Sequence, residues 1–197
     1  MPLHEPKNAN GAGLVLTHGA GGNCHAPLLV AVAEAFCAAG FYVLRYDLPF
    51  RQRRPFGPPS PATAASDRDG LREAVDSMRA RVSGPVYLGG HSYGGRQATM
   101  LAAEEPELAA GLILLSYPLH PPKKPAQMRT AHFPALRTPA TFVHGTRDDF
   151  GSIEEMRAAL ELIPAATSLV AIEGAGHDLN RGKFDIERLV VRPQFPT

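Results

Sequence analysis

The chain has 197 residues, a length that suits one domain, and its formal charge of +1 argues against the basic footprint of a nucleic-acid-binding protein. Hydrophobic residues make up 44% of the sequence, which is enough for a sizeable core and argues against a mostly disordered chain. Glycine and proline together supply 38 residues, roughly a fifth of the chain against a usual share of about 12%, and this excess predicts many tight turns. We expect one domain spanning residues 1–197.

The cysteines and the apolar stretches indicate in which cellular compartment the protein is expected. The sequence has two cysteines, Cys24 and Cys37, and they do not form a CxxC motif. We therefore expect neither a zinc cluster nor a disulfide framework. The longest apolar stretches, such as residues 27–33, fall far short of the ~18 residues that a membrane span needs. Residues 1–11 lack the apolar run of a signal peptide. These features predict a soluble, cytoplasmic protein that binds neither nucleic acid nor membrane.

Short runs rich in leucine and β-branched residues alternate with longer amphipathic runs. In chain order, the sequence predicts a strand at 14–17, a helix at 27–39, a strand at 41–46, a helix at 67–82, capped by Ser66 or Asp67, a strand at 86–89 and a helix from 93 to about 103. It then predicts strands at 112–115 and 141–144, a helix at 152–162, a strand at 168–172 and a short helix at 184–191. This order indicates an α/β fold with a mostly parallel sheet of about six strands and helices on both faces. Such sheets place their sites at the carboxyl ends of the strands.

The strongest local signal is Gly90-His91-Ser92-Tyr93-Gly94, which fits G-x-S-x-G between a predicted strand and a predicted helix. A serine at the apex of such a turn is strained, and glycine on either side removes Cβ atoms that would collide. The helix that begins at Tyr93 directs its amino end at the site and favours developing negative charge there. Ser92 is therefore the candidate nucleophile, while the competing interpretation is an ordinary glycine-rich turn.

A serine nucleophile needs a base, and the base needs a carboxylate that orients it. Asp148 follows the fifth predicted strand and His177 follows the sixth, so all three candidates lie at strand carboxyl ends. No other histidine lies C-terminal to Asp148. We favour Asp148 as the acid, with Asp149 as the alternative. His144 is interpreted as structural and Asp178 as the cap of the following segment.

Acyl transfer also needs two amide N–H groups directed at the oxyanion. One is expected from Tyr93, the residue after the candidate nucleophile. The other is expected from the loop at residues 17–22, through Ala20 or, as the alternative, Gly21. Dinucleotide binding is the competing interpretation of this glycine-rich loop, but Cys24 stands where G-x-G-x-x-G/A requires a small residue.

With these residues assembled, the chain resembles the α/β-hydrolase superfamily from His18 to His177. The segments at 116–122, 129–132 and 145–151 are similar to a narrower group, the testis-expressed-protein and NSL-complex-subunit type of small hydrolase-like proteins, near the dienelactone-hydrolase-like proteins. The resemblance implies a three-layer fold with Ser92 as nucleophile, Asp148 as acid and His177 as base. Dienelactone hydrolases proper use a cysteine nucleophile, and this chain has no cysteine at the elbow.

The chain departs from the superfamily pattern in two respects. Only six strands are predicted, because about thirteen residues precede the first of them and leave little room for the usual opening antiparallel hairpin. The connection at residues 116–138 is short and proline-rich, so we expect no cap domain. An open, shallow site follows from this expectation.

A basic segment at residues 50–56 carries Arg51, Arg53 and Arg54 close to the expected rim of the site. It is interpreted either as a solvated loop or as a surface that captures an anionic substrate or an acidic partner. Arg96 lies one helical turn after Ser92 and is predicted to pair with a carboxylate in the sheet rather than touch substrate.

The sequence therefore predicts a serine hydrolase that cleaves small esters or related acyl compounds through an acyl-enzyme, with no metal and no organic cofactor. The alternative is a hydrolase-fold interaction module that keeps the Ser-His-Asp residues but works by binding a partner. Esterase, thioesterase, lactonase and peptidase activities share this machinery, and neither the substrate nor the oligomeric state follows from the sequence.

Overall fold

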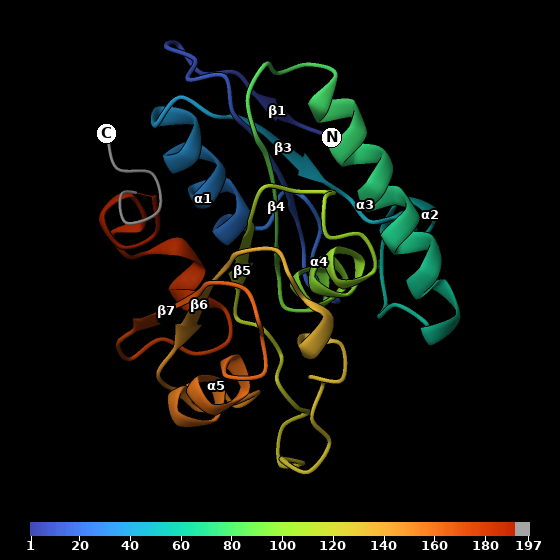
Figure 1. Ribbon diagram of the computed structural model, residues 1–197, viewed down its shortest axis with the longest axis vertical. Helices are drawn as coiled ribbons and strands as arrows, with labels where there is room; N and C mark the ends of the chain where they lie inside the picture. Colours follow the sequence, from blue (N-terminus) through green and yellow to red (C-terminus); the bar gives the residue numbers. More distant parts are fainter. Residues whose placement is uncertain (192–197) are drawn as a thin grey trace.

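One sheet organises the computed structural model, which describes residues 1–191 (Figure 1). Its strands are β1 (Leu3–His4), β2 (Gly13–Thr17), β3 (Tyr42–Tyr46), β4 (Val86–His91), β5 (Leu112–Leu115), β6 (Ala140–Gly145) and β7 (Thr167–Ile172). They lie in the order β1-β3-β2-β4-β5-β6-β7, and all neighbours pair in parallel except β1 and β3. The predicted α/β fold with a mostly parallel sheet is confirmed.

Helices cover both faces of the sheet (Figure 1). They are α1 (Pro27–Ala38), α2 (Pro49–Arg53), α3 (Ala64–Arg79), α4 (Tyr93–Glu104), α5 (Ile153–Leu160), the 3-10 turns η1 (Pro61–Thr63), η2 (Phe133–Ala135) and η3 (Leu179–Gly182), and the π-helical turn η4 (Glu187–Val191). The first core packs α3, α4 and α5 against one face, and the second packs α1, η3 and η4 against the other. Every predicted element is present, with ends that differ by no more than three residues.

Two short elements differ from the prediction. The sheet has a seventh strand, β1, whose two residues pair antiparallel with Leu44 and Val43 of β3. Two residues are too few for an alternating pattern to be recognised in a sequence. The proline-rich segment after β3 contains the five-residue helix α2, with a proline at its first turn, where the missing N–H costs no hydrogen bond.

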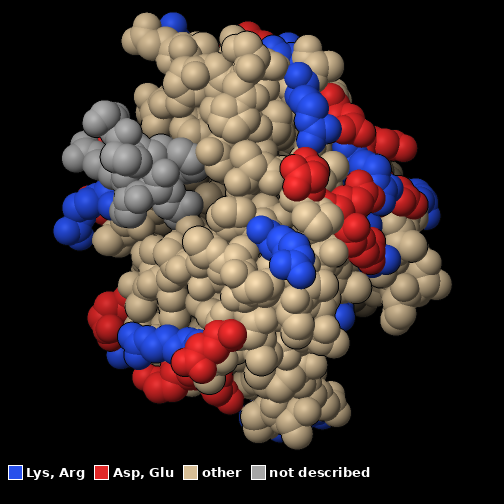
Figure 2. All heavy atoms as spheres, in the orientation of Figure 1, with Lys and Arg blue, Asp and Glu red and all other residues tan. Residues whose placement is uncertain are grey.

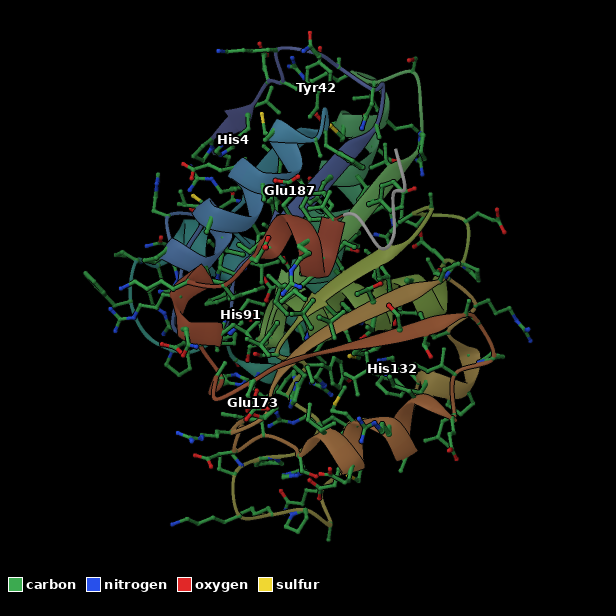
Figure 3. The ribbon with its side chains drawn as sticks, turned by 90° about the vertical axis from the view of Figure 1, so that its left-hand side faces the viewer. His4, Tyr42, His91, His132, Glu173 and Glu187 are labelled. Carbon is green, nitrogen blue, oxygen red and sulfur yellow. The ribbon has the colours of Figure 1, made fainter. Side chains whose placement is uncertain are left out.

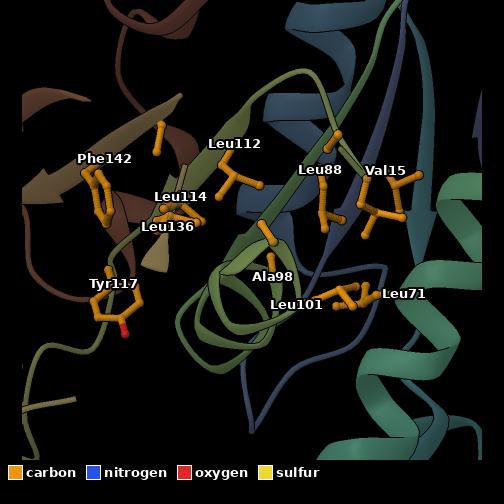
Figure 4. Packing of buried hydrophobic residues seen from close by; sticks show 14 of the residues in the cluster. Val15, Leu71, Leu88, Ala98, Leu101, Leu112, Leu114, Tyr117, Leu136 and Phe142 are labelled. Atoms are coloured by element: carbon orange, nitrogen blue, oxygen red, sulfur yellow. The ribbon is translucent and has the colours of Figure 1, made fainter. Parts of the chain in front are cut away.

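The side chains of β5 show why the central strands are apolar throughout. Leu112 and Leu114 belong to the core under α3 and α4, while Ile113 and Leu115 belong to the core under α1. All four are at most 1% exposed. Figure 4 shows the first core, where leucines of β4 and β5 pack against Ala98 and Leu101 of α4 and Leu71 of α3. A strand covered on both faces needs no polar alternation.

The carboxyl edge of the sheet has no cap over it. The connection between β5 and β6 forms only loops and the three-residue turn η2. Figure 2 shows that charged side chains on one face gather over α3 and near α5, and that most of the remaining face carries none. Among residues 1–191, no helix combines the length and the apolar character that crossing a membrane requires.

The strand order places two functional loops next to each other. β2 lies between β3 and β4 in the sheet. The chain therefore adds β3 on one side of β2 and then crosses over to add β4 on the other side. Thr17 at the end of β2 pairs with Gly90 near the end of β4. This reversal of strand order is the switch point at which open α/β sheets bind ligands.

Phe142 tests the packing of the first core. Its ring is 1% exposed and lies edge-on to Tyr117, 5.8 Å between ring centroids. We expect Phe142→Ala to lower the free energy of unfolding by about 3–5 kcal/mol, because the lost contacts leave a cavity. Urea unfolding measures this, with Leu162→Ala as control, since Leu162 is 48% exposed and its truncation should cost less than about 0.5 kcal/mol. Similar losses in both variants would contradict the described core.

Two half-buried histidines make stability depend on pH. Burial lowers the pKa of His91 and His132, labelled in Figure 3, from 6.5 to about 4. Between these values the unfolded chain binds a proton at each position and the folded chain does not, so stability falls as the pH falls from about 6.5 to about 4. Each histidine contributes at most about 1.4 kcal/mol per pH unit over that window.

We expect urea unfolding at pH 7 and pH 5 to show this loss, and His132→Gln to reduce it. Glutamine keeps an N–H that can replace the bond between His132 Nε2 and Thr99 Oγ1 but does not titrate. An unchanged slope in the variant would show that His132 does not stay neutral in the folded protein.

Candidate active site

Ser92 lies on a strained turn between β4 and α4. Its φ of 50° and ψ of −116° are rare for a residue with a side chain, and its N–H donates to the carbonyl of Leu115 at 2.8 Å. A Cβ on Gly94 would lie 2.5 Å from the His18 carbonyl oxygen, and one on Gly90 would lie 2.7 Å from the carbonyl carbon of Gly94. Both flanking positions therefore admit only glycine without displacement of the backbone.

Three side chains from distant parts of the sequence meet at this turn. His177 Nε2 lies 2.8 Å from Ser92 Oγ, and His177 Nδ1 lies 2.9 Å and 3.0 Å from the two carboxylate oxygens of Asp148. Figure 3 shows His91 and Glu173, which lie beside the ends of β4 and β7, at the same edge of the sheet. The parallel sheet thus brings Ser92, Asp148 and His177 together as the sequence predicts.

Asp148, and not Asp149, contacts the histidine. The Asp148 side chain is fully buried and accepts the amide N–H of Phe150 at 2.9 Å, whereas Asp149 is exposed. Burial alone would raise the pKa of Asp148, but the hydrogen bonds from His177 and Phe150 outweigh it and hold the pKa below its ordinary value. The carboxylate therefore stays ionised beside the imidazole.

Two further residues hold the loop that carries His177. The Phe150 ring stacks on the imidazole with 4.0 Å between ring centroids. His91 Nε2 donates to the backbone carbonyl of His177 at 2.8 Å. Sequence reasoning assigned no role to His91 or Phe150, because neither contact follows from spacing along the chain.

The glycine-rich loop after β2 is held by His18, which has no exposed surface. The Leu48 N–H donates to His18 Nε2 at 3.1 Å, so Nδ1 carries the proton and donates to the carbonyl oxygen of Gly19 at 2.8 Å. Burial lowers the pKa of His18 and favours this neutral form. The amide of Ala20, in the same peptide as the Gly19 carbonyl, donates no hydrogen bond within residues 1–191.

The contacts of Arg51 agree with neither interpretation of the basic segment. It is 7% exposed, and its guanidinium donates to the carbonyls of Ala20 at 2.8 Å, Pro55 at 2.6 Å and Gly57 at 3.1 Å. It therefore neither lies in solvent nor offers its charge to an anion, but ties the segment after α2 to the glycine-rich loop. Arg53 and Arg54 are exposed, as the solvated interpretation predicts.

Asp67 does not cap helix α3, contrary to the prediction. Helix α3 begins at Ala64, and Asp67 lies one turn inside it with no exposed surface. Its carboxylate accepts the Phe50 N–H at 2.9 Å and the Tyr93 hydroxyl at 2.8 Å. These bonds fasten α2 and the start of α4 to α3. Tertiary contacts, not helix-end chemistry, therefore satisfy this side chain.

The remaining candidates take structural positions. Asp178 accepts the N–H of Asn180 and caps η3, as predicted. His144 is buried and its Nε2 donates to the carbonyl of Gly151 at 2.8 Å, which agrees with the structural interpretation. In the described part of the chain, no three His, Cys, Asp or Glu side chains gather as a metal ion would require.

Comparison with known proteins agrees with this architecture. A serine hydrolase homologue from Coxiella burnetii has a TM-score of 0.79 at 18% identity, over 97% of this chain and 89% of that one. A serine hydrolase without a lid from Xanthomonas campestris has a TM-score of 0.74 at 19% identity, over 99% and 88%. A dienelactone hydrolase from Anabaena variabilis has a TM-score of 0.70 at 23% identity, over 98% and 86%. These likenesses show the fold.

The family follows from the sequence match together with that fold. The family model described as alpha/beta hydrolase domain matches residues 10–187. This range contains the glycine-rich loop, the strained serine turn and both partners of Ser92. The chain therefore belongs to the alpha/beta hydrolase family.

Proposed function

We propose that the protein is a serine hydrolase that cleaves small carboxylic esters or related acyl compounds. The observation that carries this proposal is the continuous line of hydrogen bonds from Asp148 through His177 to Ser92 Oγ. A serine hydroxyl becomes nucleophilic when a base accepts its proton, and the base acts efficiently when a carboxylate orients it. Both conditions are met by the hydrogen bonds at one edge of the sheet.

The reaction would proceed through an acyl-enzyme. Ser92 Oγ attacks the substrate carbonyl carbon while its proton moves to His177 Nε2. The tetrahedral intermediate collapses when His177 protonates the leaving alcohol, leaving an ester on Ser92. Water then gives a proton to His177 and attacks this ester, and His177 passes that proton to Ser92 Oγ as the acid leaves, which restores the serine hydroxyl. Asp148 holds the imidazole and stabilises its positive charge.

The oxyanion would be bound by the amides of Tyr93 and Ala20. Tyr93 is the first residue of α4, where the N–H has no partner inside the helix and the helix dipole favours negative charge. His18 binds the Gly19 carbonyl, and in a planar trans peptide the Ala20 N–H points the opposite way. The held carbonyl supports Ala20 as the second donor, with Gly21 as the alternative.

The absence of a cap over residues 1–191 supports small or protruding acyl substrates. Dienelactone hydrolase and lid-less serine hydrolase are the descriptions of two proteins with this fold, and both agree with a carboxylesterase-like activity. The resemblance to the testis-expressed-protein and NSL-complex-subunit group stays a prediction. Thioesterase and lactonase activities would use the same residues.

Ser92→Ala tests the proposal directly. We expect the variant to lose at least about 10³-fold in kcat on short-chain p-nitrophenyl esters and to lose labelling by a fluorophosphonate. Ser83→Ala is the matched control, because Ser83 is exposed in the connection before β4, at the opposite end of that strand from Ser92. Equal rates in wild type and Ser92→Ala would refute the assignment.

The same experiment separates the interaction module from the enzyme. A folded wild-type protein that forms no fluorophosphonate adduct, yet retains a stable partner in a pull-down, would favour the module. An adduct on Ser92 with turnover of any ester in the panel would favour the enzyme.

Arg51→Met tests how the glycine-rich loop is held. Without the bond to the Ala20 carbonyl we expect the loop to lose its fixed geometry, and kcat to fall roughly tenfold or more while KM changes less. Complete loss of one oxyanion donor lowers kcat by about 10²–10³-fold, and this is the largest effect that we expect for Arg51→Met. Arg53→Met, an exposed arginine of the same helix, should leave both constants unchanged. Equal effects of the two variants would show that Arg51 does not position the loop.

A further inference from the structure

Two half-buried arginines near Ser92, Arg96 and Arg129, carry positive charge without a counterion. No carboxylate lies within 4.0 Å of either guanidinium in the described part of the chain, contrary to the predicted partner for Arg96. Arg96 Nε is buried and has no hydrogen-bond partner, while the rest of the guanidinium interacts with the buried Tyr117 hydroxyl and counteracts the rise in its pKa. The printed hydrogen bond of the Arg129 guanidinium is a 3.4 Å contact with the Pro118 carbonyl.

Two arginines of α3 show what a structural role looks like here. Arg68 pairs with Glu104 at 3.3 Å and Arg72 pairs with Glu105 at 2.5 Å. Arg96, by contrast, shares its surroundings with a second cation. Burial and the nearby charge of Arg96 both lower the pKa of Arg129. An anion placed between the two arginines would relieve this repulsion.

Both arginines lie at the carboxyl edge of the sheet. The Arg96 N–H donates to the Ser92 carbonyl at 2.9 Å, so Arg96 is one helical turn from the serine. The Arg96 guanidinium acts on the Tyr117 hydroxyl and on Arg129, both of which follow β5. Arg129 is fixed to the loop after β5, because its carbonyl accepts the Tyr117 hydroxyl at 2.6 Å.

Arg96 lines a groove of about 400 Å³ along α4. The wall on α4 and the opposite wall are formed by Tyr93, Arg96, Gln97 and Met100, and by Pro59, Ser60, Pro61 and Ala64, respectively. Gln97 is fully buried, and its Oε1 accepts Arg68 at 3.2 Å while its Nε2 has no partner. The groove is therefore lined by Tyr93, whose amide is the proposed oxyanion donor, and by Arg96, whose charge has no counterion among the described residues.

We propose that this groove binds the acid part of the substrate, and that Arg96, aided by Arg129, binds a second carboxylate at the far end of that acid. The inference rests on the proposed function and names its substrate class, the monoesters of short dicarboxylic acids. Guanidinium and carboxylate match in geometry and charge, so such a ligand satisfies the free donors.

The spacing limits the length of the acid. One helical turn rises about 5.4 Å, and an extended chain advances roughly 1.2 Å per bond. Roughly four or five bonds therefore separate the reacting carbonyl from the bound carboxylate. Succinyl, glutaryl and adipyl esters bracket this length.

The first experiment measures preference for the anionic ester. We would compare kcat/KM for monoethyl succinate, glutarate and adipate with ethyl butanoate, pentanoate and hexanoate, in which a methyl group replaces the carboxylate. We expect the wild type to prefer one monoacid over its neutral counterpart by at least about tenfold, and Arg96→Gln to reduce this ratio by about tenfold or more.

Arg129→Gln provides a second variant and should reduce the same ratio to a smaller extent, so the test stands even if Arg96→Gln does not fold. Arg137→Gln is the control, because Arg137 is exposed before the amino end of β6, away from Ser92, and the ratio should stay at the wild-type value. A wild type without preference, or Arg96 and Arg129 variants with an unchanged ratio, would overturn the proposal.

The second experiment does not depend on turnover. Calorimetric titration of glutarate, and of the succinate and adipate dianions, into Ser92→Ala measures binding of the product acid. We expect affinity to fall by about tenfold or more when Arg96→Gln is added. Affinity that is unaffected by Arg96 would overturn the subsite. Ester turnover that is unaffected by Ser92→Ala would instead refute the proposed function and leave the binding result standing.

Discussion

The close approach of two backbone segments at the switch point of the sheet governs the rest of the site. Helix α4 begins so near the loop after β2 that a Cβ on Gly94 would lie 2.5 Å from the His18 carbonyl. This approach requires parallel pairing of β2 and β4, a strained Ser92 and glycine at the flanking positions. The serine hydroxyl and the candidate oxyanion amides consequently share one small volume, and the apolar cores on both faces of the sheet keep that geometry fixed.

Buried polar side chains hold the loops around this volume by binding backbone groups. His18 binds Gly19 and Leu48, Arg51 binds Ala20 and the segment after α2, and His91 binds His177. Buried polar groups are costly unless they are paired, so each of these bonds specifies one loop conformation. Arg96 and Arg129 are exceptions to this rule. Their charges have no carboxylate counterion among the described residues, which is why we assign them to a ligand and not to the scaffold.

Most of the fold could be predicted because its signals are local and repeated. Short runs of apolar and β-branched residues identified the six parallel strands, and glycine and serine spacing identified the turn at Ser92. The strand β1 was not predicted, because two residues are too few to show an alternating hydrophobic pattern. The helix α2 was not predicted, because it has only five residues and lies in a proline-rich segment. Asp148 and Asp149 are adjacent in sequence, and only the path of the backbone after β6 turns one inward and leaves the other exposed.

The sequence by itself determined the order of strands and helices, the strained serine turn and the positions after strands where partners of Ser92 could lie. These features depend on residues that are neighbours along the chain. Only the tertiary structure decided that Arg51 and Asp67 serve the scaffold, that His91 and Phe150 hold His177, and that Arg96 has no carboxylate within reach. Pairing of charges and hydrogen bonds depends on distance in space. Residues separated by tens of positions, such as Asp67 and Tyr93, become partners only when the sheet and its helices have packed.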